Sequence, residues 1–152
     1  MNVVTAGDLA PDIELQTDAN IPLKLSSLRG TKVVLYFYPK ADTPGCTVEA
    51  CEFRDTAKAF AGRNAVVVGI SPDGTASQAK FKMKYALPFT LLADVNRAAA
   101  EAYGVYKEKN MYGRKVMGIE RTTFVIGEDG KVTKVFGKVK AKGHAEQVLA
   151  AL

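Results

Sequence analysis

The chain has 152 residues, of which 21 are Lys or Arg, 16 are Asp or Glu, and 47% are hydrophobic. This length fits one domain, and such a domain buries roughly 70% of the surface of its unfolded chain, so it needs no disulfide or metal to hold a core. The composition is close to ordinary globular usage and excludes disordered and fibrous classes of protein.

The net charge of +5 is unevenly distributed, because residues 105–142 carry ten Lys or Arg against four Asp or Glu while residues 1–104 carry eleven of each. The basic residues stand singly and are not interleaved with stacking aromatics in the manner of an RNA-binding motif. We therefore interpret them as a solvated basic face and expect no nucleic-acid partner.

The first fifteen residues contain no Lys or Arg, which is not the pattern of a secretory signal. No apolar run approaches the roughly 20 residues that a membrane helix requires, so no membrane partner is expected. We expect a cytoplasmic protein, and in that compartment a cysteine pair is more often catalytic or metal-binding than structural.

Apolar runs predict the first strands. Residues 33–39 (VVLYFYP) and 65–70 (AVVVGI) are rich in β-branched and aromatic side chains, and the second run is followed by a turn at residues 71–74. Both are typical of strands buried on two faces. Further along, residues 122–126 and 132–136 predict a β-hairpin.

Helical patterns lie between and after these strands. From Cys46 onward, apolar residues at positions 46, 50, 53, 57 and 60 recur with the period of about 3.6 residues that places them on one helix face. Further helices are expected at about 75–85, 97–103 and 143–152. The alternation predicts an α/β fold in one domain over residues 1–152, with a central mixed sheet flanked by helices on both faces.

The chain contains two cysteines, Cys46 and Cys51, within the stretch PKADTPGCTVEACEF at residues 39–53. Their spacing is too wide for a Cys-x-x-Cys redox pair, and no second cysteine pair or histidine cluster exists to complete a zinc site. His144 is the only histidine. We therefore expect neither a metal nor a cofactor.

Thr43, Pro44 and Cys46 read as a helix start, with the threonine as N-cap, the proline in the first helical position and the cysteine in the third. A thiolate there is stabilised by the positive end of the helix dipole. Lowering an ordinary cysteine pKa from about 8.5 to about 6 requires roughly 3.4 kcal/mol, whereas a helix terminus gives at best about 2 kcal/mol. A nearby cation is therefore implied, and Arg121, directly before a predicted strand, is the best candidate.

On an intact helix, a separation of five residues places two Cα atoms roughly 8.6 Å apart on different faces. A disulfide usually needs about 4.4 to 6.8 Å. Cys46 and Cys51 therefore bond only if the first turns unwind, which suggests that one thiol reacts in the folded helix and the other captures its sulfenic acid afterwards. The alternative is that Cys51 is a small apolar side chain packed in the core.

The stretch PKADTPGC resembles the active-site pattern of the peroxiredoxin family, and the continuation TVEAC is similar to its bacterioferritin comigratory protein or peroxiredoxin Q branch. The resemblance extends through GDLAPDIELQT, VVGISPD and YGVYKEKNMYGRKVMGIERTTFVIGEDGKV. It implies a thioredoxin-like fold, a monomer, and a thiol-dependent peroxidase of hydrogen peroxide and organic hydroperoxides that serves in antioxidant defence.

The resemblance also implies a role for each site residue. Cys46 would attack the terminal peroxide oxygen, with Thr43 holding the peroxide and Arg121 stabilising the thiolate and the peroxide bond. Pro39 would shield the pocket from water. Cys51 would resolve the sulfenic acid into an intramolecular disulfide, which thioredoxin or a similar dithiol reductant would then reduce.

Two other functions remain open at this point. A general disulfide reductase is disfavoured by the cysteine spacing, and a binding or chaperone-like role would use the basic face. Among further residues, Glu49 is either a polar contact near Cys46 or a solvated helix residue. Asp73 is most simply a turn former.

Overall fold

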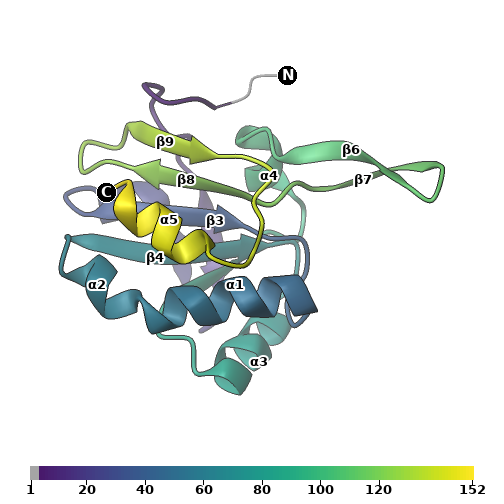
Figure 1. Ribbon diagram of the computed structural model, residues 1–152, viewed down its shortest axis with the longest axis horizontal. Helices are drawn as coiled ribbons and strands as arrows, with labels where there is room; N and C mark the ends of the chain where they lie inside the picture. Colours follow the sequence, from purple (N-terminus) through teal and green to yellow (C-terminus); the bar gives the residue numbers. More distant parts are fainter. Residues whose placement is uncertain (1–3) are drawn as a thin grey trace.

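The computed structural model describes residues 4–152, and its centre is a seven-stranded sheet with the strand order β2-β1-β5-β4-β3-β8-β9 (Figure 1). Strand β3 pairs in parallel with β4 and antiparallel with β8, so the sheet is mixed. The strands are β1 (Glu14–Thr17), β2 (Pro22–Lys24), β3 (Lys32–Phe37), β4 (Ala65–Ser71), β5 (Thr90–Ala93), β8 (Thr122–Ile126) and β9 (Val132–Phe136).

Five α-helices and one short 3-10 helix are found in the described part of the chain. They are η1 (Leu25–Leu28), α1 (Pro44–Asp55), α2 (Ala57–Ala61), α3 (Thr75–Tyr85), α4 (Ala98–Ala102) and α5 (His144–Ala150). Within residues 4–152, none of the helices has both the length and the apolar character needed to cross a membrane.

Alternation along β3 divides the core between the two faces of the sheet. Val33, Leu35 and Phe37 belong to a buried cluster that includes residues of η1 and α4. Val34 and Tyr36 belong to the cluster that α1, α2, α3 and α5 cover. A strand buried on both faces carries a continuous apolar run, which explains why the sequence at residues 33–38 is so uniformly apolar.

The strands and helices predicted from the sequence are present, and the expectation of a mixed sheet with helices on both faces is confirmed. The prediction of one continuous helix face from Cys46 to Phe60 is wrong in one respect, because α1 ends at Asp55 and α2 begins at Ala57. At the break, the Thr56 hydroxyl donates to the Glu52 carbonyl oxygen at 2.8 Å. Such local bonding of a threonine competes with continuation of the helix.

A separate two-stranded ribbon projects from the body, to the right in Figure 1. Strands β6 (Tyr106–Met111) and β7 (Arg114–Ile119) pair antiparallel with each other and not with the central sheet. We call residues 106–119 the arm. The arm was not predicted from the sequence, because charged residues interrupt its apolar ones and leave no apolar run to indicate a strand.

Candidate active site

Cys46 lies in the first turn of α1, close after β3 along the chain. The loop between them is fixed by Asp73, whose carboxylate accepts hydrogen bonds from the Ala41 amide at 2.7 Å and the Ser71 hydroxyl at 2.6 Å. Asp73 was interpreted as a turn former, and here it also ties the end of β4 to the loop that delivers the cysteine. Cys46 is almost completely buried, at 1% exposure.

Arg121 reaches the same place from another part of the chain. It directly precedes β8, and the pairing of Phe37 with Thr122 sets the start of β8 beside the end of β3. Its Nη2 atom donates a hydrogen bond to the Cys46 sulfur at 3.3 Å. The predicted contact between this guanidinium and Cys46 is therefore present.

Gly45 allows the guanidinium to approach so closely. A Cβ atom at this position would lie 3.1 Å from Arg121 Nη2, a separation tighter than ordinary van der Waals contact. A side chain at this position would therefore require the guanidinium to shift by a few tenths of an ångström. Gly45 was not singled out in the sequence analysis, although it stands directly before the cysteine.

Glu49 completes a buried ionic cluster with Arg121 and Cys46. Its Oε1 accepts a hydrogen bond from Arg121 Nη1 at 2.7 Å, and the residue is only 1% exposed. Its other oxygen, Oε2, has no hydrogen-bond partner among the described residues. Of the two interpretations left open for Glu49, the polar contact near the site is therefore confirmed.

Burial dominates the electrostatics of Glu49. It raises the pKa of this carboxyl from 4.5 to about 7, and the opposing effect of Arg121 offsets only part of the shift. Burial also lowers the pKa of Arg121, but the neighbouring Glu49 and Cys46 together raise it above its ordinary value. The guanidinium is thus shared between a carboxyl group and the sulfur.

Thr43 and Pro39 border this cluster along the chain. Thr43 is the N-cap of α1 with extended backbone, as predicted, but its side chain does not cap the helix. Its hydroxyl donates instead to the Lys40 carbonyl oxygen at 2.8 Å. A hydroxyl that donates in this direction keeps its lone pairs available to accept another hydrogen bond. Pro39 is half-buried and follows Tyr38, which is fully buried.

Cys51 lies in the same helix, one and a half turns further on. It is a free thiol, partly exposed, while Cys46 is a free thiol that is buried. Partial exposure does not fit the alternative in which Cys51 only fills the core. With α1 continuous from Pro44 to Asp55, the two cysteines occupy the intact helix on which their spacing forbids a disulfide.

A polar network that the sequence did not reveal supports the loop from beneath. The Tyr38 hydroxyl donates to Gln78 Oε1 at 2.6 Å, and Gln78 Nε2 donates to the Ser71 hydroxyl at 2.9 Å. Ser71 in turn donates to Asp73, which holds the loop. A tyrosine and a glutamine 40 residues apart give no sequence signal of this contact.

His144 packs the start of α5 against α1 and against strands β8 and β9. Its Nε2 lies 2.7 Å from the Thr123 hydroxyl, and its ring meets the edges of Phe53 and Phe136. Burial lowers its pKa from the ordinary value of 6.5. Among the residues that the structure describes, no three His, Cys, Asp or Glu side chains gather as a metal site.

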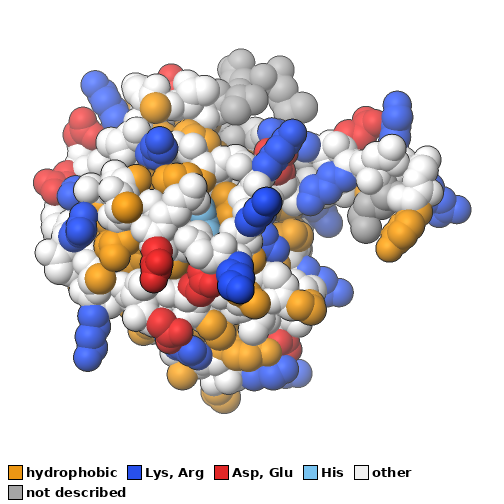
Figure 2. Space-filling model, in the orientation of Figure 1, with side chains coloured by type: hydrophobic (Ala, Val, Ile, Leu, Met, Phe, Trp, Pro, Cys, Tyr) orange, Lys and Arg blue, Asp and Glu red, His pale blue; other side chains and the backbone are white. Residues whose placement is uncertain are grey.

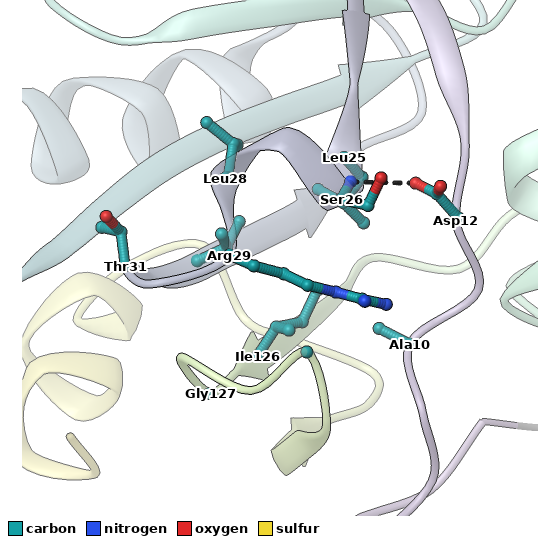
Figure 3. A pocket seen from close by; sticks show the side chains of 11 residues that line it. Ala10, Asp12, Leu25, Ser26, Leu28, Arg29, Thr31, Ile126 and Gly127 are labelled. Atoms are coloured by element: carbon teal, nitrogen blue, oxygen red, sulfur yellow. Dashed lines mark hydrogen bonds between the residues drawn. The ribbon is translucent and has the colours of Figure 1, made fainter.

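A small cavity lies at the other end of the strands, where Val33 pairs with Ile126 (Figure 3). Figure 3 shows the Arg29 side chain extended between Ala10 and the turn at Gly127. The cavity holds about 20 Å³, which is room for roughly one water molecule. It is therefore too small, and too far along the sheet from Arg121 and Cys46, to serve as their substrate site.

The comparisons with known proteins agree with this geometry. A sequence model of the AhpC/TSA family matches residues 6–135. The chain is 48% identical to "Peroxiredoxin Bcp" of Bacillus subtilis, over 98% of this chain and 95% of that protein. It is 49% identical to "Putative peroxiredoxin bcp" of Coxiella burnetii, over 98% and 99% of the two chains. The chain belongs to the peroxiredoxin family.

Similar solved structures come from the peroxiredoxin Q, or bacterioferritin comigratory protein, branch of this family. A peroxiredoxin Q structure from Xanthomonas campestris superposes with a TM-score of 0.91 at 39% identity, covering 98% of this chain and 95% of that one. The bacterioferritin comigratory protein of the same organism gives a TM-score of 0.90 at 38% identity, covering 99% and 96%. The fold is therefore thioredoxin-like, and the protein is a peroxidase, an oxidoreductase.

Proposed function

We propose that Cys46 is the residue that reacts with the hydroperoxide. Its thiolate attacks the terminal oxygen of R–O–O–H, a sulfur–oxygen bond forms as the oxygen–oxygen bond breaks, and Cys46 becomes a sulfenic acid. The leaving RO⁻ takes up a proton and departs as an alcohol, or as water when the substrate is hydrogen peroxide. The observation that carries this proposal is the 3.3 Å contact from Arg121 Nη2 to the Cys46 sulfur.

The neighbouring groups have complementary roles in this step. The Arg121 guanidinium favours the thiolate and stabilises the negative charge that develops on the leaving oxygen. The Thr43 hydroxyl accepts the hydrogen of the peroxide and orients it, since its own hydrogen is committed to the Lys40 carbonyl. Pro39 limits the access of water to the sulfur.

Cys51 then resolves the sulfenic acid. Its thiol attacks the Cys46 sulfur, the disulfide forms, and the sulfenic oxygen leaves as water. Because the two residues are separated on the intact helix, the first turns of α1 unwind before this step. A dithiol protein of the thioredoxin type then returns two electrons and two protons, which restores both thiols.

The burial of Cys46 bears on the substrate. The sulfur of a residue that is only 1% exposed is reached more readily by the narrow –O–O–H group than by a bulky one. The Xanthomonas campestris bacterioferritin comigratory protein is described by its alkyl peroxide reduction activity. We infer that this chain likewise accepts hydrogen peroxide and organic hydroperoxides. That it acts as a cytoplasmic monomer in antioxidant defence, without nucleic-acid or membrane partners, stays a prediction.

The test is intact mass with thiol labelling after one equivalent of hydrogen peroxide. The mass of the wild-type protein should fall by two hydrogens, the protein should stay monomeric, and neither thiol should react with the label. Cys51→Ser should instead hold a trappable sulfenic acid on Cys46, and Cys46→Ser should lose peroxide turnover by at least about 1,000-fold, since the nucleophile is gone. Full turnover by Cys46→Ser would refute the proposal.

A further inference from the structure

The arm is fixed to the body only at its base. There the Glu120 amide donates to the Val105 carbonyl oxygen at 2.8 Å, and the Lys107 ammonium pairs with the Glu120 carboxylate at 2.8 Å. The Arg97 guanidinium lies over the Tyr106 ring. Beyond these residues, β6 and β7 have their extensive contacts with each other, among the elements that the structure describes. Most of the ribbon therefore stands free of the fold.

The tip of the arm presents an aromatic side chain to solvent. Tyr112 and Gly113 form the turn between β6 and β7, with φ angles of 53° and 79°. Hairpin turns of this kind favour Asn, Asp or Gly, and a tyrosine with positive φ is uncommon. Tyr112 is nevertheless fully exposed, and Val116 and Met117 on β7 are 38% and 49% exposed. No folding requirement explains an unfavourable aromatic residue at a fully exposed tip.

The arm is also basic. Residues 106–119 carry Lys107, Lys109, Arg114 and Lys115 against a single acidic residue, Glu108, a surplus of +3. Figure 2 shows basic side chains on the projecting ribbon. Tyrosine, methionine and arginine are the residue types enriched in protein interfaces. Like charges oppose the pairing of two such arms, so the composition favours a different, acidic partner over a second copy of this chain.

The base of the arm adjoins the reactive sulfur. The chain passes from Ile119, the last residue of β7, through Glu120 directly to Arg121, which contacts Cys46. The Lys109 ammonium donates to the Ile119 carbonyl oxygen, and it lies near enough to Arg121 and Cys46 for both to influence its pKa, which burial lowers overall. A protein that binds along the arm and reaches its base therefore lies beside the start of α1.

We propose that the arm is the docking surface for the electron donor, a dithiol protein of the thioredoxin type with carboxylates around its reactive cysteine. Tyr112 and Met117 supply the apolar contact, and Arg114 and Lys115 steer the acidic rim of the donor toward the Cys46–Cys51 disulfide. This inference rests on the proposed function, because it assigns the partner of that same cycle.

A docking surface assists the protein donor, because its thiols must be aligned with the Cys46–Cys51 disulfide. A donor thiolate attacks one sulfur of the disulfide and forms a mixed disulfide while the other cysteine leaves as a thiolate. The donor's second thiolate then attacks the mixed disulfide, so that the donor departs oxidised and both Cys46 and Cys51 are reduced. A hydroperoxide needs no such surface, and neither does a small dithiol such as dithiothreitol.

The experiment compares two electron donors on two arm variants. Tyr112→Asn removes the aromatic ring with a residue that suits positive φ, so the turn is retained. Arg114→Glu combined with Lys115→Glu reverses two exposed charges. With thioredoxin, thioredoxin reductase and NADPH, each variant should show a KM for thioredoxin raised at least about fivefold, since rim charges and aromatic anchors set association. With dithiothreitol, peroxide turnover should match the wild type.

Lys58→Glu combined with Lys131→Glu is the matched control, since it makes the same change in net charge at exposed residues outside the arm. It should leave the KM for thioredoxin within about twofold of wild type. The inference is overturned if the arm variants keep the wild-type KM, if the control raises it equally, or if turnover with dithiothreitol falls in parallel. Failure of the wild type to consume peroxide with either donor would instead reject the proposed function itself.

Discussion

Glu49 carries a carboxyl group whose one oxygen pairs with Arg121 and whose other oxygen is buried without a partner. Because burial raises its pKa from 4.5 to about 7, the folded protein holds the proton more tightly than the unfolded chain does. The stabilisation is therefore complete below about pH 4.5 and is lost as the pH rises through 7.

Replacement of Glu49 with Gln should remove this dependence. At pH 5 the free energies of unfolding of the variant and the wild type should differ by only about 1 kcal/mol, since a protonated Glu and a Gln are alike and little of the stabilisation is yet lost. At pH 8 the variant should be more stable by up to roughly 3 kcal/mol. Denaturant unfolding of both proteins from pH 5 to 8 measures the difference, and a difference that stays constant with pH would contradict the argument.

Gly45 offers a second residue-scale prediction. An Ala here should strengthen the helix, by up to about 1 kcal/mol, yet displace the Arg121 guanidinium from its position 3.1 Å from the new Cβ. We expect the second-order rate of Cys46 oxidation to fall about tenfold or more, in line with the loss of one electrostatic contact in the transition state. Competition with a reporter peroxidase for hydrogen peroxide measures this rate.

Gly74→Ala is the matched control for Gly45→Ala. Gly74 also stands at a helix start, as the N-cap of α3, and a Cβ there would meet no atom within 4 Å. Its oxidation rate should equal that of the wild type. Equal slowing in both variants, or none in Gly45→Ala, would show that close approach of the guanidinium does not set the rate.

At the scale of the elements, apolar patterns in the sequence predicted most of the buried strands and helices, but not the buried strand β5. The run at residues 33–39 predicted β3, and the Thr43-Pro44 pair predicted the start of α1, because burial and helix capping leave local signals. Strands β1, β2 and β5 and the arm were not predicted. The side chains of β1, β2 and the arm are largely polar or half-exposed, whereas β5 is buried but only four residues long, and the pairing of all of them depends on partners elsewhere in the chain.

In the candidate site, too, residues that are close in sequence could be predicted, whereas contacts between distant residues could not. Cys46, Thr43 and Cys51 are close in sequence, so their arrangement on one helix start followed from spacing. Arg121 was chosen only because it precedes a strand, and its contact with Cys46 spans 75 residues. The burial of Glu49 depends on that contact and could not be decided from helix spacing alone.

At the scale of the whole molecule, reactivity is concentrated at one end of a sheet that is otherwise rigidly packed. The start of α1 is tied to α3, where Lys84 and the Tyr85 hydroxyl bind the Asp42 carboxylate at 2.9 and 2.7 Å. Its second half is tied to α5 through Glu52, which accepts a hydrogen bond from the Gly143 amide at 2.8 Å. Both ties are exposed, so unwinding of residues 44–51 has to break mainly the buried contacts of Cys46 and Glu49 with Arg121, while the tie through Glu52 lies beyond that segment.

Oxidation should therefore loosen the start of α1 and leave the sheet intact. In hydrogen exchange followed by mass spectrometry, the disulfide form should lose amide protection over residues 44–51, while β3, β4 and β8 keep theirs, because local opening costs far less than global unfolding. Cys51→Ser treated with one equivalent of peroxide is the control and should keep α1 protected, since it cannot form the intramolecular disulfide. Unchanged protection of α1 in the disulfide form would mean that the bond forms without unwinding, and loss across β3 and β8 would mean that the whole fold, rather than one helix start, opens to form it.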